Sequence, residues 1–294
     1  MSGALLCSPD RAQQNPGLFE RPPHCAEFII GRAFGSTRWL HAGYKSNNAK
    51  STKGRNAIIM TTYVLVHGAW GGGWKYARVA ERLRARGHTV FTPTLTGQGE
   101  RAHLFSGDIN LTTHITDILN VIRHEDLSGI VLAGHSYGGM VITGVADKIP
   151  EKISALVYLD AFVPQDGQSL FDLNIPKNTQ MFIDKAGAAG GLAVPPPSAA
   201  FFGVNEKDAA RVDELAAPHP IATMIEKLNL SGAYRNVKKR IYVHGTMLPR
   251  ESPFKPFYER AVAEGWEAHA LPCGHDVMLD LPDRVTEILD GAGK

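Results

Sequence analysis

The strongest constraint on the fold of this chain is an alternation, from Met60 onward, between apolar segments rich in β-branched residues and amphipathic segments. The apolar segments have the length of strands, and the amphipathic ones repeat apolar residues at helical spacing. Because nearly continuous apolar strands need cover on both faces, the pattern predicts an α/β fold with a mostly parallel, doubly wound sheet. The expected strands are TYVLVHG (62–68), HTVFTPTL (88–95), GIVLAGHS (129–136), ISALVYLDAF (153–162), KRIYVHG (239–245) and WEAHALP (266–272).

One segment interrupts this alternation between the fourth and fifth expected strands. Residues 164–236 contain the irregular run KAGAAGGLAVPPPSAAFFG together with short helical patterns such as EKDAARVDELAA. A structureless loop of that length is uncommon inside a compact domain, so an inserted helical lid is the simpler interpretation. Such lids lie over the carboxyl ends of parallel strands and shape a substrate pocket.

Composition excludes several classes of function rather than selecting one. The 294 residues are 44% hydrophobic and 20% charged, and the net charge of +2 gives no reason to expect a nucleic-acid partner. No run of 18 apolar residues occurs, so no membrane span and no membrane partner is expected. Cys7, Cys25 and Cys273 form no CxxC pair, which favours a reducing, cytoplasmic setting without a zinc site or a disulfide framework.

Residues 1–59 differ from the rest of the chain. They contain eight Lys or Arg against three Asp or Glu and show no sustained helical or strand period. We expect them to be a poorly ordered leader or extension, with residues 60–294 forming the folded domain. Their composition weakly resembles an organelle transit peptide, and a start assigned upstream of Met60 or a cloning extension explains it equally well.

The pentapeptide GHSYG, at 134–138, is the most informative motif. It follows the apolar segment GIVLA and precedes the helical pattern GGMVITGVA, which is the context of a nucleophile elbow. Such a turn needs small residues beside the nucleophile and holds the hydroxyl exposed at the start of a helix. The sequence therefore predicts Ser136 as a catalytic nucleophile.

A serine hydroxyl needs a general base, and the order of elements places that base late in the chain. His275 stands in PCGHDVMLDLP, between the last expected strand and the last expected helix. No other histidine combines that order with that loop, so His275 is the predicted base. Cys273, two residues earlier, lacks the local signature of a nucleophile and is interpreted as a buried, inert thiol.

Acyl transfer also requires hydrogen-bond donors for the oxyanion of the tetrahedral intermediate. The segment HGAWGGGW follows the first expected strand, so the amide of Ala69 is a predicted donor, with the amide of Tyr137 as the second. A phosphate cradle is the alternative interpretation of glycines 71–73, but neither the Lys-Ser/Thr of a P-loop nor GxGxxG is present there. Trp70 is expected either to line the pocket or to pack in the core.

From Met60 to Gly291 the chain resembles an α/β-hydrolase, in particular the compact group of plant methylesterases, hydroxynitrile lyases and bacterial esterases. Four segments carry the resemblance in the right order: YVLVHGAWGGGW, GHSYGG, LVYLDAFVP and GHDVMLDLP. The resemblance implies the α/β-hydrolase fold with a Ser-His-acid triad, a helical lid and no cofactor.

The lyases of this group have a Thr just after the first strand and a Lys directly after the catalytic His. Here Gly68 and Ala69 occupy the first place, and Asp276 follows His275. An acidic residue at that place is expected to repel cyanide. The sequence therefore favours ester or lactone hydrolysis, with the hydroxynitrile lyase reaction as the first alternative.

The third member of the triad is not where most relatives have it. The strand KRIYVHG is followed by TMLPRESPF, whose first acid is Glu251. Asp160, at the carboxyl end of ALVYLD, is the preferred candidate because its strand is expected to neighbour that of the nucleophile. Glu251 is the alternative acid, and Asp276, Asp166 or the absence of any acid are left open.

The predicted function is that of a serine carboxylesterase that hydrolyses small, fairly apolar esters or lactones through an acyl-enzyme. A ligand-binding receptor that keeps the fold with a weak triad is the second alternative. The partner is a small-molecule ester or lactone, and a homodimer is compatible with the sequence. The residues expected to shape the pocket are Trp70, Phe162, Phe171 and Phe182, with Met181, Phe201, Phe202 and Met224 as further lid residues.

Overall fold

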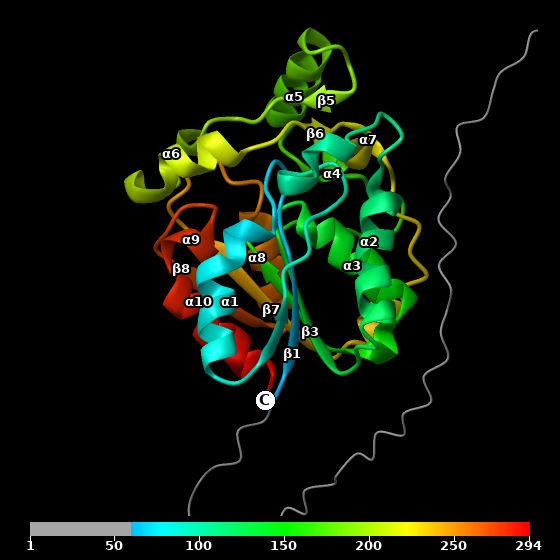
Figure 1. The fold of residues 1–294 in the computed structure, drawn as a ribbon, viewed down its shortest axis with the longest axis vertical. Helices are drawn as coiled ribbons and strands as arrows, with labels where there is room; N and C mark the ends of the chain where they lie inside the picture. The colour runs from blue at the N-terminus through cyan, green and yellow to red at the C-terminus, as the bar shows by residue number, and fades with distance from the viewer. Residues whose placement is uncertain (1–59) are drawn as a thin grey trace, which may run out of the picture. The chain divides into compact units, whose positions relative to one another are not determined.

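The computed structural model describes residues 60–294, so the expectations for residues 1–59 lie outside the described part. Six strands form one sheet in the order β2-β1-β3-β4-β7-β8, and every neighbouring pair is parallel (Figure 1). Each strand lies inside a segment that the sequence predicted as a strand. The strands are β1 (Thr62–Val66), β2 (Thr89–Phe91), β3 (Ile130–His135), β4 (Ile153–Leu159), β7 (Lys239–Gly245) and β8 (Glu267–Leu271).

Both faces of the sheet are covered, which explains why the strands are almost continuously apolar. In β1, Val64 and Val66 join the core on one face, whereas Tyr63 and Leu65 join the core on the other. Helices α2, α3 and α8 pack on the first face, and α1, α9 and α10 pack on the second. The predicted doubly wound arrangement is therefore confirmed. The helices are α1 (Ala77–Ala85), α2 (Leu111–His124), α3 (Gly138–Lys148), α8 (Lys255–Ala263), α9 (Val277–Asp280) and α10 (Pro282–Ala292).

Helix α2 shows how local sequence sets these elements. The Asn110 side chain accepts a hydrogen bond from the amide of Thr113, and the Thr113 hydroxyl accepts one from the amide of Asn110, which forms a capping box. Ile115, Ile118 and Ile122 then recur at helical spacing and are buried against the sheet.

The sheet has a topological switch point at β1. The chain runs from β1 to β2 on one side and then returns to place β3 on the other side of β1. The loops after β1 and β3 therefore diverge at the carboxyl edge of the sheet, and crevices at such points are the usual ligand sites of open α/β sheets.

The expected insertion lies between β4 and β7, and α5, β5, β6 and α6 stand beyond the carboxyl ends of the strands (Figure 1). Strands β5 and β6 form a small antiparallel pair. The longest helix of the insertion, α5, lies in a segment whose residues show no helical pattern. The elements are α4 (Leu170–Leu173), α5 (Pro176–Ala188), β5 (Ala193–Val194), η4 (Ala199–Phe202), α6 (Glu206–Leu215), β6 (His219–Pro220), α7 (Ala222–Ile225) and η5 (Ala233–Asn236). Three short 3₁₀ turns complete the fold, η1 (Gly73–Tyr76), η2 (Gly99–Leu104) and η3 (Pro150–Lys152).

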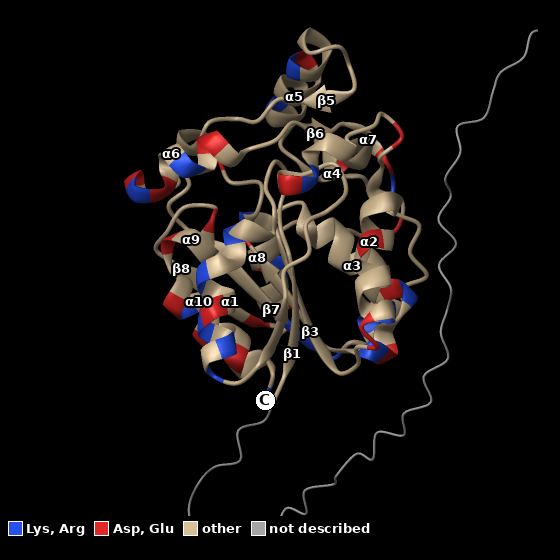
Figure 2. Ribbon diagram, in the orientation of Figure 1, with Lys and Arg blue, Asp and Glu red and all other residues tan. Residues whose placement is uncertain are grey.

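Charged side chains lie mainly on the helices, and the strands are largely uncharged (Figure 2). On α2, α6 and α10, acidic and basic residues are interspersed, so none of these helices presents a single sign of charge. Among the helices of residues 60–294, none combines the length and the apolar character that crossing a bilayer requires.

Candidate active site

Ser136 lies in the turn between β3 and α3, with a left-handed backbone φ of 54°. Two glycines allow this turn to pack closely against neighbouring backbone segments of the same chain. A Cβ on Gly138 would lie 2.7 Å from the carbonyl oxygen of Val66, and one on Gly139 would lie 2.1 Å from that of Phe162. Because real side chains do not fit at these distances, the two glycines are a condition for the elbow itself.

Left-handed backbone in non-glycine residues is concentrated at this site. Four non-glycine residues among residues 60–294 have a positive φ: Trp70 (59°), Ser136 (54°), Asp160 (43°) and Asp126 (47°). The first three follow β1, β3 and β4, which are adjacent strands of the sheet. Such backbone persists only where the surroundings enforce it, and it is typical of functional sites.

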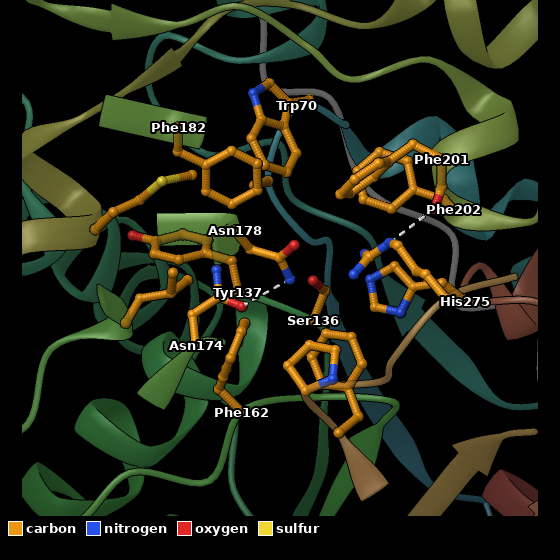
Figure 3. A pocket seen from close by; sticks show the side chains of 16 residues that line it. Trp70, Ser136, Tyr137, Phe162, Asn174, Asn178, Phe182, Phe201, Phe202 and His275 are labelled. Atoms are coloured by element: carbon orange, nitrogen blue, oxygen red, sulfur yellow. Dashed lines mark hydrogen bonds between the residues drawn. The ribbon is translucent and has the colours of Figure 1, made fainter. Parts of the chain in front are cut away.

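His275 lies between β8 and α9 and is held between two aromatic rings. Phe254 stacks on it with ring centroids 4.5 Å apart and 10° between the planes, and Phe202 stacks at 5.6 Å. Its Nδ1 donates to Oδ2 of Asp160 over 2.7 Å, which leaves Nε2 for the other side of the ring. In Figure 3 the Ser136 hydroxyl faces the His275 ring.

The Asp160 carboxylate is fully buried at the end of β4. Besides His275, it accepts hydrogen bonds from Nδ1 of His244 over 2.8 Å and from the amide of Gly245 over 3.1 Å. Burial alone raises the pKa of Asp160, but the hydrogen bonds from His244 and His275 outweigh burial and hold the pKa below its ordinary value. At neutral pH the carboxylate is therefore ionised and oriented toward His275.

The other carboxylates considered from the sequence have different surroundings. Glu251 is exposed, and its carboxylate forms no hydrogen bond or ion pair with residues 60–294. Asp166 accepts a hydrogen bond from the amide of Leu230, and Asp276 is paired with Lys75. Of these candidates, Asp160 alone is hydrogen-bonded to the imidazole of the predicted base.

The pairing of Asp276 bears on the expectation that an acidic residue after His275 repels cyanide. Both of its oxygens accept from Nζ of Lys75, at 2.9 and 3.0 Å, and both side chains are buried. Burial raises the pKa of Asp276, but the Lys75 ammonium outweighs burial and lowers the pKa to about 2. Because this carboxylate is neutralised by its partner and does not line the cavity, the expected repulsion of cyanide by Asp276 does not hold.

The two predicted oxyanion donors follow adjacent strands of the sheet. Ala69 follows β1, and Tyr137 follows Ser136 at the N-terminus of α3; both are buried and line the cavity. Neither amide N–H donates a hydrogen bond to another group within residues 60–294. A buried amide without a hydrogen-bond partner costs free energy, so such amides are rare outside sites that bind a ligand. Two of them beside a serine hydroxyl are suited to bind the oxyanion of the tetrahedral intermediate.

Three other buried histidines, His67, His114 and His135, are held neutral and hydrogen-bonded within the fold. Burial lowers the pKa of His67 to about 3, of His114 to about 4 and of His135 to about 3. His114 bonds the hydroxyl of Tyr137 through Nδ1 at 2.8 Å and the carbonyl of Thr96 through Nε2 at 2.9 Å. These rings position the chain around the cavity and are not placed to take a proton from Ser136.

A cavity that opens to solvent lies at Ser136 and His275, and the empty space in it and at its mouth is about 370 Å³. Its walls are largely aromatic, as Figure 3 shows for the rings around Ser136. Trp70 is fixed by a hydrogen bond from its indole N–H to the carbonyl of Val194 and packs edge-on against Phe182. The aromatic lining residues are Trp70, Tyr137, Phe162, Phe182, Phe201, Phe202 and Phe254.

The structure differs from the sequence-based expectation at Phe171. This side chain is half-buried and packs against the core, whereas its neighbour Leu170 lines the cavity. Met181 likewise lies outside the lining, whereas Phe182 belongs to it. Because α4 and α5 are helices, adjacent residues point in different directions, and a sequence without a known helix phase does not tell which one faces inward.

Three polar lining residues were not anticipated from the sequence: Asn174, Asn178 and Arg250. The Asn178 amide donates to the side-chain oxygen of Asn174 at 3.3 Å, and both stand beside Ser136 in Figure 3. Arg250 belongs to the loop after β7 in which a carboxylate was sought. No local pattern distinguishes these residues from ordinary surface positions, so only the folded arrangement identifies them.

Metal-ligand clusters and a second nucleophile are not found at this site. No group of three or more His, Cys, Asp and Glu side chains among residues 60–294 is arranged to hold a metal ion. Cys273 is buried, and burial raises the pKa of its thiol to about 12, which makes it unreactive at neutral pH.

Known proteins resemble the chain across the part that holds this site. A profile of the alpha/beta hydrolase family matches residues 63–288. The carbendazim hydrolyzing esterase of Nocardioides sp. (strain SG-4G) is 45% identical over 245 residues, which are 80% of this chain and 100% of that protein. Methylesterase 1 of Arabidopsis thaliana is 33% identical over 129 residues, which are 40% of this chain and 48% of that protein. An extracellular alpha/beta-hydrolase from Paenibacillus species, a solved structure, has a TM-score of 0.71 at 26% identity, covering 80% of this chain and 99% of that one.

Proposed function

Because the chain belongs to the alpha/beta hydrolase family, we propose that it is a serine carboxylesterase that acts on small, fairly apolar esters through an acyl-enzyme. One observation supports this proposal above the others. A buried carboxylate, Asp160, is hydrogen-bonded to His275, and the Ser136 hydroxyl faces the same imidazole in a cavity where two amides have no partner. That arrangement is what acyl transfer needs.

Acylation begins when Nε2 of His275 takes the proton of the Ser136 hydroxyl as its oxygen attacks the substrate carbonyl. Asp160 holds Nδ1 protonated and stabilises the imidazolium. The amides of Ala69 and Tyr137 donate to the oxyanion of the tetrahedral intermediate. His275 then gives its proton to the leaving oxygen, the carbonyl–oxygen bond breaks, and an alcohol and an acyl-serine result.

Deacylation repeats these steps with water. His275 takes a proton from the water that attacks the acyl-serine, the same amides bind the oxyanion, and the proton returns to the Ser136 oxygen. The products are a carboxylic acid and the free enzyme.

The lining of the cavity supports a particular class of substrate. Aromatic walls favour small, flat, largely apolar molecules. The side chains of Asn174 and Asn178 add hydrogen-bonding groups that can bind an amide or ether group of the substrate. The similar Nocardioides protein is named as a carbendazim hydrolyzing esterase. We extend this to methyl and aryl esters and carbamates of similar size for the present chain, and to small lactones, which offer the same carbonyl.

The two alternatives receive no specific support. Ala69 offers no hydroxyl at the place where the lyases hold a cyanohydrin, although Asp276 no longer argues against them. The receptor alternative depended on the absence of a carboxylate near His275, and Asp160 lies 2.7 Å from that ring.

Labelling with a fluorophosphonate probe tests the proposal. We expect wild-type protein to be modified at Ser136 and the folded Ser136→Ala variant to remain unmodified. p-Nitrophenyl acetate and butyrate are expected to be hydrolysed faster than the octanoate, because the cavity is small. A homoserine lactone panel tests the lactones, and mandelonitrile tests the lyase. An unmodified Ser136 in folded wild-type protein contradicts the proposal.

A further inference from the structure

Arg250 is the one Lys or Arg that lines the cavity among residues 60–294, and it forms no ion pair with an Asp or Glu of that part. Its side chain is half-buried. Nε donates to the carbonyl of Phe201 at 3.1 Å, Nη1 donates weakly to the carbonyl of Glu251 at 3.4 Å, and the guanidinium lies 3.8 Å from the centre of the Phe201 ring. These contacts orient the cation without neutralising it and leave N–H donors unused.

Lys75 is the one fully buried Lys or Arg among residues 60–294, and it is paired, as is the more exposed Arg78. Lys75 is bound by both oxygens of Asp276, and Arg78 forms a bidentate pair with Asp208 at 2.6 and 2.8 Å. Burial lowers the pKa of Arg250 to about 10, so it still carries its charge at neutral pH. Holding a desolvated charge without a counter-ion is unfavourable, and a ligand that supplies the anion would relieve that cost.

The position of Arg250 indicates which part of a substrate it meets. Phe254, four residues later, stacks on His275 at 4.5 Å, and Phe202, the neighbour of the ring under Arg250, stacks on it as well. In Figure 3 Phe201, Phe202 and His275 lie on one side of Ser136, and Asn174, Asn178 and Phe182 lie on the other. Arg250 therefore belongs to the His275 wall.

The leaving oxygen of an ester must lie beside His275, because this residue protonates it. We propose that Arg250 binds a carboxylate on the leaving-group part of the substrate, so that the preferred substrates are esters whose alcohol or phenol carries an anionic group. This inference rests on the proposed esterase function. The guanidinium fork suits a carboxylate geometrically, and the aromatic wall around it strengthens the interaction by excluding water.

A matched pair of substrates tests the inference, namely 3-acetoxybenzoate and its neutral amide, 3-acetoxybenzamide. In both, the bond from the acetyl carbon to the phenol oxygen breaks, and His275 protonates the phenol oxygen. We expect wild-type kcat/KM to favour the carboxylate by about tenfold to a hundredfold after correction for hydroxide-catalysed rates, mainly through KM. Arg250→Gln should abolish that ratio, and Arg250→Lys should keep part of it because the charge remains.

Arg284→Gln is the matched control, because it removes an exposed arginine charge far from the cavity. It should leave the ratio as in the wild type. A purely structural role of Arg250, through its bond to the carbonyl of Phe201, would lower kcat/KM for both esters equally and leave their ratio unchanged. That result, or a wild-type enzyme without preference for the carboxylate, overturns the inference.

A binding measurement separates this inference from the esterase proposal. Calorimetry with the Ser136→Ala protein compares 3-hydroxybenzoate with the neutral 3-hydroxybenzamide. We expect the carboxylate to bind about tenfold more tightly and to lose that advantage when Arg250→Gln is added. If neither ester is hydrolysed and Ser136 stays unlabelled, the esterase proposal fails, whereas equal binding of the two ligands contradicts the role of Arg250.

Discussion

Nδ1 of His244, near the end of β7, donates a hydrogen bond over 2.8 Å to Oδ1 of Asp160, which follows β4. The amide of Gly245 donates to the same oxygen at 3.1 Å, and the other oxygen accepts from His275. The strand after which an acid was expected therefore supplies two donors to an acid that follows the neighbouring strand. Since β4 and β7 are hydrogen-bonded neighbours, their carboxyl ends lie side by side, and a carboxylate after either strand could reach the imidazole of His275.

His244 is accordingly expected to position the triad without touching substrate. In His244→Phe the Asp160 carboxylate loses one of its donors, so its orientation toward His275 becomes less fixed and kcat should fall about tenfold to a hundredfold with little change in KM. His244→Asn keeps an N–H donor at similar reach and should retain most of the activity. Steady-state kinetics on p-nitrophenyl acetate distinguish the two variants, and equal losses in both would show that packing of the ring, not its donor, matters.

The identity of the acid is tested by a pair of isosteric changes. Asp160→Asn should lower kcat on the order of ten-thousandfold, because a neutral amide neither selects the productive tautomer of His275 nor stabilises its imidazolium. Glu251→Gln should stay within about twofold of the wild type, since Glu251 is exposed and has no contact with the imidazole. Turnover measurements on both variants decide the question. The reverse pattern would place the acid in the loop after Gly245.

Much of this site could be predicted from the sequence because its information is local. The GHSYG motif is typical of a tight turn in which only glycine fits beside the nucleophile. The period of the apolar residues places that turn between a strand and a helix. Ser136 and His275 could therefore be named from short segments and their order. The sequence shows the insertion as an interruption but does not predict its longest helix, α5, because Gly187 and the polar residues of this helix leave no clear apolar face.

The remainder depends on contacts between distant segments. Asp160 is oriented toward His275 by hydrogen bonds from His244 and Gly245, which lie on another strand, and nothing in the segment ALVYLD reveals these donors. In the same way, Asp276 has the sequence position of an active-site charge but is neutralised by Lys75, which enters from the turn before α1. A sequence shows which residues are present but not which donor reaches which carboxylate.

The close approach at Gly139 predicts a large effect of a small side chain. Gly139→Ala would bring a Cβ to 2.1 Å from the carbonyl oxygen of Phe162, so the elbow must shift and we expect loss of turnover together with a clear loss of stability. Gly187→Ala is the matched control in helix α5, where nothing lies within 4 Å of the new Cβ. Alanine there should raise stability by about 0.5 to 1 kcal/mol, because glycine is the poorer helix former. Urea unfolding and esterase turnover of the two variants check both expectations.

The Lys75–Asp276 pair predicts an acid-dependent loss of stability. In the unfolded chain an Asp titrates near about 3.9, whereas in the folded protein the Lys75 ammonium outweighs burial and the pKa of Asp276 is about 2. A depressed folded pKa means that the stabilisation is present above about pH 4 and is lost as the pH falls toward 2, by about 2 to 3 kcal/mol in total.

The free energy of unfolding in urea, measured from pH 6 down to pH 3, should therefore decline more steeply in the wild type than in Lys75→Met/Asp276→Leu, which has no charge to titrate at this place. Lys75→Met alone should cost about 3 to 5 kcal/mol at pH 7, because it leaves a buried carboxylate without its counter-ion. Parallel pH curves for the wild type and the double variant would show that the pair does not contribute to acid sensitivity.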